Sequence, residues 1–202
     1  MKNIFLLTLA VFALVSCKLS QQYTFNADFS GKYQLLFDLN EMASYGVEDP
    51  DSIPNVFEDF NLDSVKQAYE QIKGLSHVNV SAAKNVLNVR YNFNDLDALN
   101  ASLDVQNNGE FSLNNGSGIK FSNENGVFKY NFEEENAEST PDSIAEMMTF
   151  IDYDIVMEFA KPINSASNGI ISESGNRLTL QGNLGEVAAK KKSLNVEVTF
   201  KK

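Results

Sequence analysis

The side chains most often used in enzyme chemistry are sparse in this chain, which has one histidine and one cysteine among its 202 residues. The histidine, His77, stands beside Val78 in a stretch with the character of a strand. A Ser-His-Asp triad would need His77 beside an activated serine, and the sequence contains no Gly-x-Ser-x-Gly elbow. A zinc site would need several His or Cys ligands. We therefore interpret His77 as an ordinary strand residue, and we expect no catalytic residue, no metal site and no cofactor.

The acidic residues offer two further kinds of site. An EF-hand calcium loop starting at Asp49 would need glycine at its sixth position and glutamate at its twelfth, where the chain has Pro54 and Phe60. This excludes an EF-hand and leaves a solvated acidic loop, with a looser calcium site as the alternative, built from Asp49, Asp51, Glu58 or Asp59. Residues 133–135 are three glutamates, which repel one another and favour exposure. Paired carboxylates for glycoside cleavage need a fixed separation that residue order does not define.

The cysteine has the most informative surroundings. An apolar run over residues 4–15 follows a single lysine and ends in Leu14-Val15-Ser16-Cys17. It is shorter than the ~20 residues that cross a membrane, and its charged start and short apolar centre are typical of a secretory signal peptide. The four residues resemble the lipobox of bacterial lipoproteins. The resemblance implies signal recognition through Leu14, Val15 and Ser16, cleavage before Cys17, and acyl chains such as palmitate on its thiol and new amino group.

These features divide the chain into three parts. We predict a lipoprotein signal peptide at 1–16, the lipidated cysteine and a short tether at 17–22, and a single α+β domain at 23–202. The five residues after Cys17 reach at most ~17 Å, so the domain is expected close to its bilayer. Surface-exposed lipoproteins of some bacteria carry acidic residues there, whereas this chain has Lys18. We therefore expect the domain to lie at the periplasmic face of the outer membrane. The alternative to the lipobox interpretation is a plain signal peptide, in which Cys17 has no role.

The charge balance excludes some classes of partner. The chain has 16 basic and 27 acidic residues, a net charge of −11. Removal of the predicted signal peptide takes away Lys2 and no acid, which leaves 15 basic residues and a net charge of −12. Nucleic-acid binding needs clustered Lys and Arg, and anionic lipid headgroups attract basic segments. We therefore expect no nucleic-acid partner, and we interpret the excess of acid mainly as a source of solubility.

Alternation of apolar and polar residues predicts β-strands over most of the domain. Apolar residues alternate over 23–29 and 33–39 around Ser30-Gly31, which indicates a β-hairpin. Asn125-Gly126 is typical of a tight turn between strands. The fold class is therefore α+β, a mostly antiparallel sheet of hairpins with two or three short helices packed on one face. Further strands are predicted at 78–80, 87–93, 111–113, 119–121, 127–132, 153–159, 170–171, 178–180 and 194–200.

Helical spacing appears in three places. Residues 63–73 and 95–103 are predicted helices, with Asn94 as the cap of the second, and a third begins near residue 141. Residues 40–61 lack periodicity and are predicted as a loop with one short helix. In the third helix an apolar stripe is the candidate apolar binding face, formed by Ile144, Met147, Met148 and Ile151. Methionines adapt to irregular partners, although such a stripe more often covers a sheet as core. Residues 190–192, the only lysine cluster, are interpreted as a solvated turn.

Two segments resemble the LppM-like family of bacterial envelope lipoproteins. Residues 23–33 resemble the family's opening strand, glycine-rich turn and second strand, with Phe29 in place of the first glycine. Residues 153–180 resemble its strand, proline-containing turn, polar loop and strand, without the family's frequent tryptophan. The resemblance implies an α+β sheet domain on an envelope lipoprotein, and it transfers no catalytic residue.

Together these observations predict a membrane-anchored, non-enzymatic envelope lipoprotein that binds or scaffolds another envelope component. Its expected partners are the membrane, through acyl chains on Cys17, and an envelope protein. A carrier of lipid or another apolar small ligand is the first alternative. A hydrolase acting through carboxylates is the second.

Overall fold

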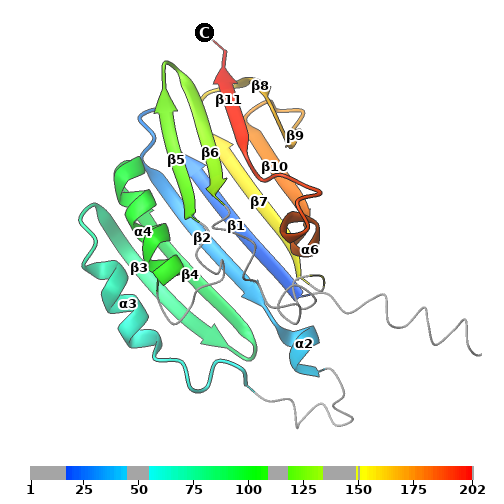
Figure 1. Ribbon diagram of the computed structural model, residues 1–202. Coiled ribbons are helices and arrows are strands. Elements are labelled where there is room, and N and C mark those ends of the chain that lie inside the picture. Colours follow the sequence, from blue (N-terminus) through cyan, green and yellow to red (C-terminus); the bar gives the residue numbers. More distant parts are fainter. Residues whose placement is uncertain (1–16, 45–54, 109–117, 134–148, 150, 202) are drawn as a thin grey trace, which may run out of the picture.

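The computed structural model describes residues 17–44, 55–108, 118–133, 149 and 151–201. The predicted signal peptide, the strand predicted at 111–113 and two residues of the alternative calcium site, Asp49 and Asp51, lie outside these residues. The other two, Glu58 and Asp59, are described and exposed. Within the described residues, the chain forms a seven-stranded sheet in the order β3-β4-β2-β1-β7-β10-β9 and a four-stranded sheet in the order β5-β6-β11-β8 (Figure 1).

The larger sheet contains β1 (Cys17–Phe25), β2 (Gly31–Asp38), β3 (Leu75–Ala83), β4 (Val86–Phe93), β7 (Ile151–Phe159), β9 (Ile170–Ile171) and β10 (Arg177–Asn183). The smaller sheet contains β5 (Gly118–Glu124), β6 (Val127–Glu133), β8 (Ile163–Ala166) and β11 (Val196–Phe200). The helices are α2 (Asn40–Ser44), α3 (Leu62–Glu70), α4 (Leu96–Asn108) and α6 (Leu184–Ala188).

The α+β class predicted from the sequence is confirmed. Most neighbouring strands are antiparallel, whereas β1 and β7 pair in parallel from Cys17↔Ile151 to Phe25↔Phe159. The smaller sheet, α3 and α4 all lie on one side of the larger sheet. The opposite side carries mainly polar residues, and we call it the polar face.

The core between the layers is rich in aromatic rings. Alternate residues of β1 and β2 point into it, and their rings meet those of the smaller sheet. Tyr23 lies 4.9 Å from Phe121 and Phe25 lies 5.0 Å from Phe128, measured between ring centroids. On the helical side, Tyr69 of α3 stacks on Tyr91 of β4 at 5.4 Å. Such large rings bury much apolar surface and prefer offset or tilted pairs, so this cluster holds the two sheets together.

The helices predicted at 63–73 and 95–103 are present as α3 and α4, and their ends differ slightly from the prediction; α2 is the short helix predicted within 40–61. The Asn61 side chain accepts a hydrogen bond from the Ser64 amide at the start of α3. At α4 the capping side chain is Asp95, which accepts from the Ala98 amide at 2.8 Å. Asn94, the predicted cap, instead donates its backbone N–H to the Gly74 carbonyl. Strand β8 and helix α6 were not predicted, because both are too short to show periodicity.

Several sheet edges carry features that oppose pairing with another strand. On β5, the Asn100 amide side chain donates to the Phe121 carbonyl and accepts from the Phe121 N–H, each at 2.8 Å. On β3, the ladder to β4 shifts between Ser76 and Asn79. Strand β9 is only two residues long. Blocked, bulged or very short edges are the usual protection against edge-to-edge association, so the faces of the sheets remain the surfaces for interaction.

The first hairpin turn places a phenylalanine in a left-handed conformation. Phe29 has φ 63°. Its ring stacks on Phe128 at 5.5 Å and contacts Phe200 at 6.1 Å. Packing therefore holds a backbone conformation that costs an ordinary residue about 1–2 kcal/mol.

Two substitutions at Phe29 separate this backbone cost from the packing. Both Phe29→Ala and Phe29→Gly remove the ring, but only glycine adopts positive φ freely. We expect both variants to be less stable than the parent, and Phe29→Ala to be about 1 kcal/mol less stable than Phe29→Gly. Urea unfolding measures the difference. Equal stability of the two variants would contradict the left-handed assignment.

Candidate functional site

The predicted lipidation residue lies at one end of the larger sheet. Cys17 is the first residue of β1 and pairs with Ile151, the first residue of β7. Its side chain is 2% exposed and points to the same side of the sheet as Leu19 and Tyr23, toward the core. The other lipobox residues, Leu14, Val15 and Ser16, lie outside the described residues. Nearby, β2 continues into α2 and β10 into α6, so this end of the sheet gathers several chain segments (Figure 1).

The segment expected to be a tether is part of the fold. Residues 18–22 lie in β1 and pair with β2 on one side and β7 on the other. Leu19 and Gln21 are buried, and the Gln21 side-chain carbonyl accepts a hydrogen bond from the Tyr23 hydroxyl at 2.9 Å. Because Gln21 is polar, residues 17–22 do not show the alternation of apolar and polar residues that predicts a strand, although Gln21 is buried. Residues 17–22 therefore belong to the folded domain.

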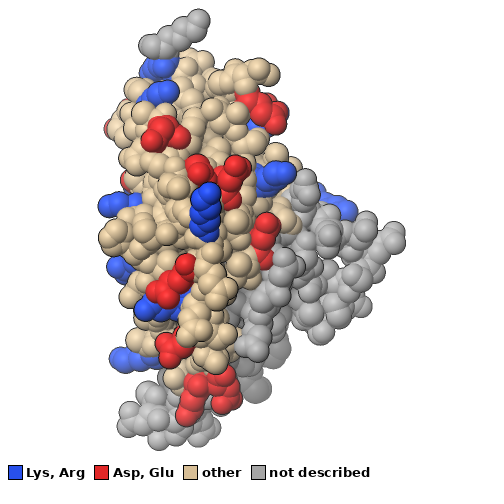
Figure 2. Space-filling model, turned by 90° about the vertical axis from the view of Figure 1, so that its left-hand side faces the viewer, with Lys and Arg blue, Asp and Glu red and all other residues tan. Residues whose placement is uncertain are grey.

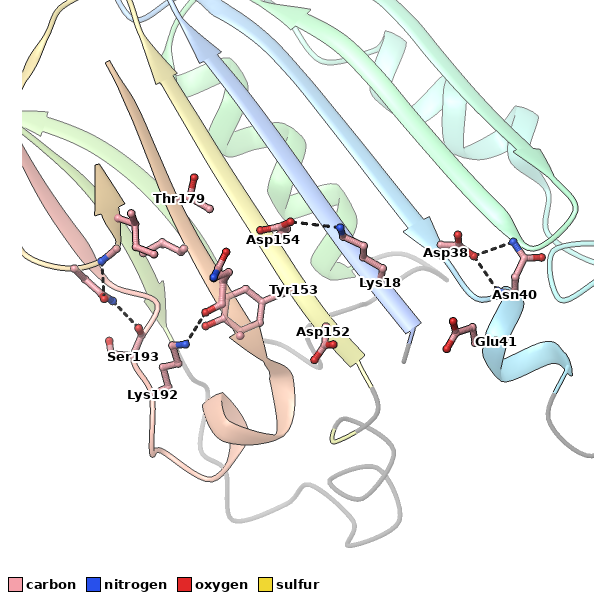
Figure 3. A pocket seen from close by; sticks show the side chains of 16 residues that line it. Lys18, Asp38, Asn40, Glu41, Asp152, Tyr153, Asp154, Thr179, Lys192 and Ser193 are labelled. Atoms are coloured by element: carbon pink, nitrogen blue, oxygen red, sulfur yellow. Dashed lines mark hydrogen bonds and ion pairs between the residues drawn. The ribbon is translucent and has the colours of Figure 1, made fainter. Parts of the chain in front are cut away.

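Beside this end of β1 the protein has an open cleft of about 1040 Å³. Figure 3 shows Lys18 and Asp154 at its centre, Asp38, Asn40 and Glu41 on one side, and Lys192 and Ser193 on the other. Sequence analysis did not find this cleft, because the parallel pairing of β1 with β7 brings together residues more than 130 positions apart. No local pattern carries that information.

Three aspartates of the cleft each interact with a different residue. Asp154 pairs with Lys18 at 3.5 Å, and Asp152 accepts a hydrogen bond from the Asn183 amide at 3.1 Å. Asp38 accepts from the backbone and side-chain N–H groups of Asn40 at 3.0 and 2.9 Å. Among the described residues, no group of three or more His, Cys, Asp or Glu side chains is placed to hold a metal ion. These charged and amide side chains could form hydrogen bonds or ion pairs with a polar ligand or partner.

At the far side of the cleft, Lys192 is held against the sheet. Its Nζ donates to the Gln181 carbonyl and lies 5.9 Å from the centre of the Tyr153 ring. Burial, with a smaller effect of Glu186, raises the pKa of the Tyr153 phenol. Gly182 makes this contact possible, because a Cβ there would lie 2.6 Å from Lys192 Nζ. Lys190 and Lys191 are exposed and Lys192 is half-buried, all three before β11, so the solvated-turn interpretation holds for the first two and only in part for Lys192.

The candidate apolar binding face is largely outside the described residues. Ile144, Met147 and Met148 fall there, whereas Ile151 is described and starts β7. Ile151 is half-buried and packs against the core as a strand residue, so the prediction that it belongs to a helix is wrong. One of the four residues of the candidate apolar face therefore lies in the larger sheet, and the apolar face stays a prediction for the other three.

The remaining candidates from the sequence are placed as follows. His77 lies in β3, as predicted, but at the shifted part of the ladder and with φ 55°. Its Nδ1 contacts the Asn92 amide at 3.2 Å and the Ser76 hydroxyl at 3.3 Å. Of the predicted 133–135 run, only Glu133 is described, at the end of β6. No helix among the described residues has the length and apolar character required to span a bilayer.

Comparison with known proteins gives one distant likeness in fold. No protein-family model matches the chain, and no curated protein matches it. Among solved structures, the chain is similar to the folded domain of LppM of Mycobacterium tuberculosis, determined by NMR. The two are 11% identical with a TM-score of 0.46, and the match covers 92% of this chain and 91% of that one.

Proposed function

We propose that this chain is a non-enzymatic envelope lipoprotein, anchored by acyl chains on Cys17, whose domain binds or scaffolds an envelope protein. The observation that supports the proposal is the lipobox-like sequence, whose last residue, Cys17, lies in β1 at one end of the larger sheet. An anchor at this residue would have no linker before the fold. The Cys17 end of the sheet would therefore rest against the bilayer, at the periplasmic face of the outer membrane.

The buried thiol sets a condition on this proposal. A thioether on Cys17 needs room that the side chain does not have while it packs beside Leu19. Because Cys17 is the first residue of its strand, it can leave the sheet while the ladder continues from Lys18↔Asp38 and Lys18↔Asp152. Strand ends open at low cost compared with the interior of a sheet. Acylation would then draw the first residue out toward the bilayer.

The exposed polar face supports a role in binding. It follows β1, where every second residue from Lys18 to Thr24 is at least partly exposed, and several edges of the described sheets are blocked or short. The open cleft beside the Cys17 end of β1 is lined mainly by polar residues. This lining favours a polar partner.

Crosslinking in cells tests the proposal. A photoreactive residue at Gln22, exposed on the polar face, would be compared with one at Lys120, exposed on β5 of the other sheet. We expect one reproducible protein neighbour from Gln22, absent from Lys120, and lost when Cys17→Ser removes the anchor. Equal products from both positions, or no protein product from either, would contradict a binding role for this face.

A further inference from the structure

The polar face carries a second cleft, of about 480 Å³, away from the Cys17 end. Two cross-strand rows form it. One row runs through Thr24, Lys32 and Asn92, which are consecutive partners across β1, β2 and β4. The next row runs through Gln22, Gln34, Arg90 and Asn79. The pairing therefore fixes a grid of hydrogen-bonding side chains on one surface.

The charge of this cleft is opposite to that of the chain. Its lining includes Lys32, Arg90 and His77 and no carboxylate, whereas the chain has a net charge of −11. Lys32 and Arg90 are diagonal neighbours on adjacent strands, a placement that puts side chains roughly 7 Å apart. Two like charges so close repel each other unless an anion lies between them. Figure 2 shows Lys and Arg side chains along its left-hand margin, the side of the polar face.

The cationic groups remain available for a ligand. Neither Lys32 nor Arg90 forms an ion pair with a described carboxylate. Arg90 donates only its Nε–H, to the Asn88 side chain at 3.0 Å, so its terminal nitrogens keep their donors. Glu158, the acid nearest in the Thr24 row, faces Arg177 at 3.9 Å on the far side of β7.

The backbone at His77 adds a local distortion to the same cleft. The ladder between β3 and β4 skips from Ser76 to Asn79, and His77 takes φ 55° within the gap. Bulges of this kind re-aim a side chain, and here the imidazole is held by the Asn92 amide beside the cationic pair. A strained residue at the rim of a cleft is typical of a binding site.

We infer that this cleft binds an acidic sugar, a hydroxyl-rich ligand that carries a carboxylate or phosphate. Lys32 and Arg90 would hold the anionic group through charge-assisted hydrogen bonds. The side-chain amides of Gln22, Gln34 and Asn79 would pair with the hydroxyls, since each amide offers both a donor and an acceptor. The cleft exposes no aromatic ring for stacking, because Tyr33 and Tyr91 point to the core. The charge is therefore required for affinity.

The distance between the cleft and Cys17 indicates where the ligand comes from. This step rests on the proposed function, in which Cys17 is the anchor. Gln22 and Thr24 come five and seven residues after Cys17 in a continuous strand. At ~3.3 Å per residue they lie roughly 17–23 Å from the anchoring end. Headgroups of the protein's own bilayer do not extend that far, so an acidic glycan or free acidic sugar is the expected source.

Binding measurements on the purified full chain in neutral detergent test the inference. The probes are trigalacturonate, the neutral maltotriose, inorganic phosphate and phosphatidylglycerol vesicles. The variant Lys32→Gln/Arg90→Gln is compared with Lys120→Gln/Lys201→Gln, which removes the same charge from exposed positions elsewhere. All four side chains are exposed, and circular dichroism verifies that the variants fold.

We expect trigalacturonate to bind the parent chain at least about tenfold more tightly than maltotriose, with phosphate competing. The cleft variant should lose at least about tenfold, and the control variant no more than about twofold. Equal losses in both variants, no binding of either anionic solute, or binding of the vesicles alone would each overturn the inference. Because the assay uses purified protein, its failure would leave the anchor and the crosslinked neighbour unaffected.

Discussion

Raising the pH from about 10.5 to 11.5 should lower the free energy of unfolding by about 4 kcal/mol. Three tyrosines, Tyr23, Tyr91 and Tyr130, are fully buried, and burial raises the pKa of each phenol above its usual value near 10. Above that pH the unfolded chain releases three protons that the folded protein keeps. Each proton contributes about 1.4 kcal/mol per pH unit, and stability falls as pH rises. Below about pH 9 the contribution is fully present.

Urea unfolding between pH 8 and 11.5 measures this slope. The variant Tyr130→Phe should reduce the slope by about one third and change stability at pH 8 by no more than about 1 kcal/mol. Its hydroxyl has no hydrogen-bond partner among the described residues. By contrast, Tyr23→Phe removes the donor to Gln21 and should cost about 1–2 kcal/mol at pH 8. A stability that stays constant to pH 11.5 would show that these phenols are accessible.

The second large effect is at Leu19, in the segment that the sequence presents as a tether. Leu19 is 6% exposed and pairs across to Phe37 and Tyr153. Truncation of a buried leucine leaves a cavity, so Leu19→Ala should lower the free energy of unfolding by about 2–4 kcal/mol. The exposed neighbour Gln22 is the control, and Gln22→Ala should stay within about 0.5 kcal/mol. If residues 18–22 were a tether, both variants would be neutral.

Local patterns predicted the local parts of the fold. The turn at Asn125-Gly126 has φ values of 54° and 78°, as its residue types require. The hairpin of β1 and β2 and the helices α3 and α4 also follow from spacing within a few residues. The parallel pair of β1 and β7 could not be predicted, because alternation is the same in parallel and antiparallel strands and the segments are far apart in the chain.

The candidate sites divide in the same way. A short motif identified Cys17, since lipobox residues are contiguous. The two clefts depend on cross-strand pairing, which brings Lys18 to Asp154 and Lys32 to Arg90. His77 stood out in the sequence as the single histidine, but its place beside two cations follows only from the fold. A contiguous motif therefore makes Cys17 a candidate for lipidation, which stays a prediction, whereas spacing along the chain reveals neither cleft.

Mass spectrometry of the N-terminal peptide, from protein extracted out of cell membranes, tests whether Cys17 is the membrane anchor. We expect a mature chain that begins at Cys17 and carries acyl chains on its thiol and amino group. We also expect Cys17→Ser to abolish both the cleavage and the membrane association. A mature chain that begins elsewhere, or an unmodified Cys17 in membrane-bound protein, would contradict the anchor.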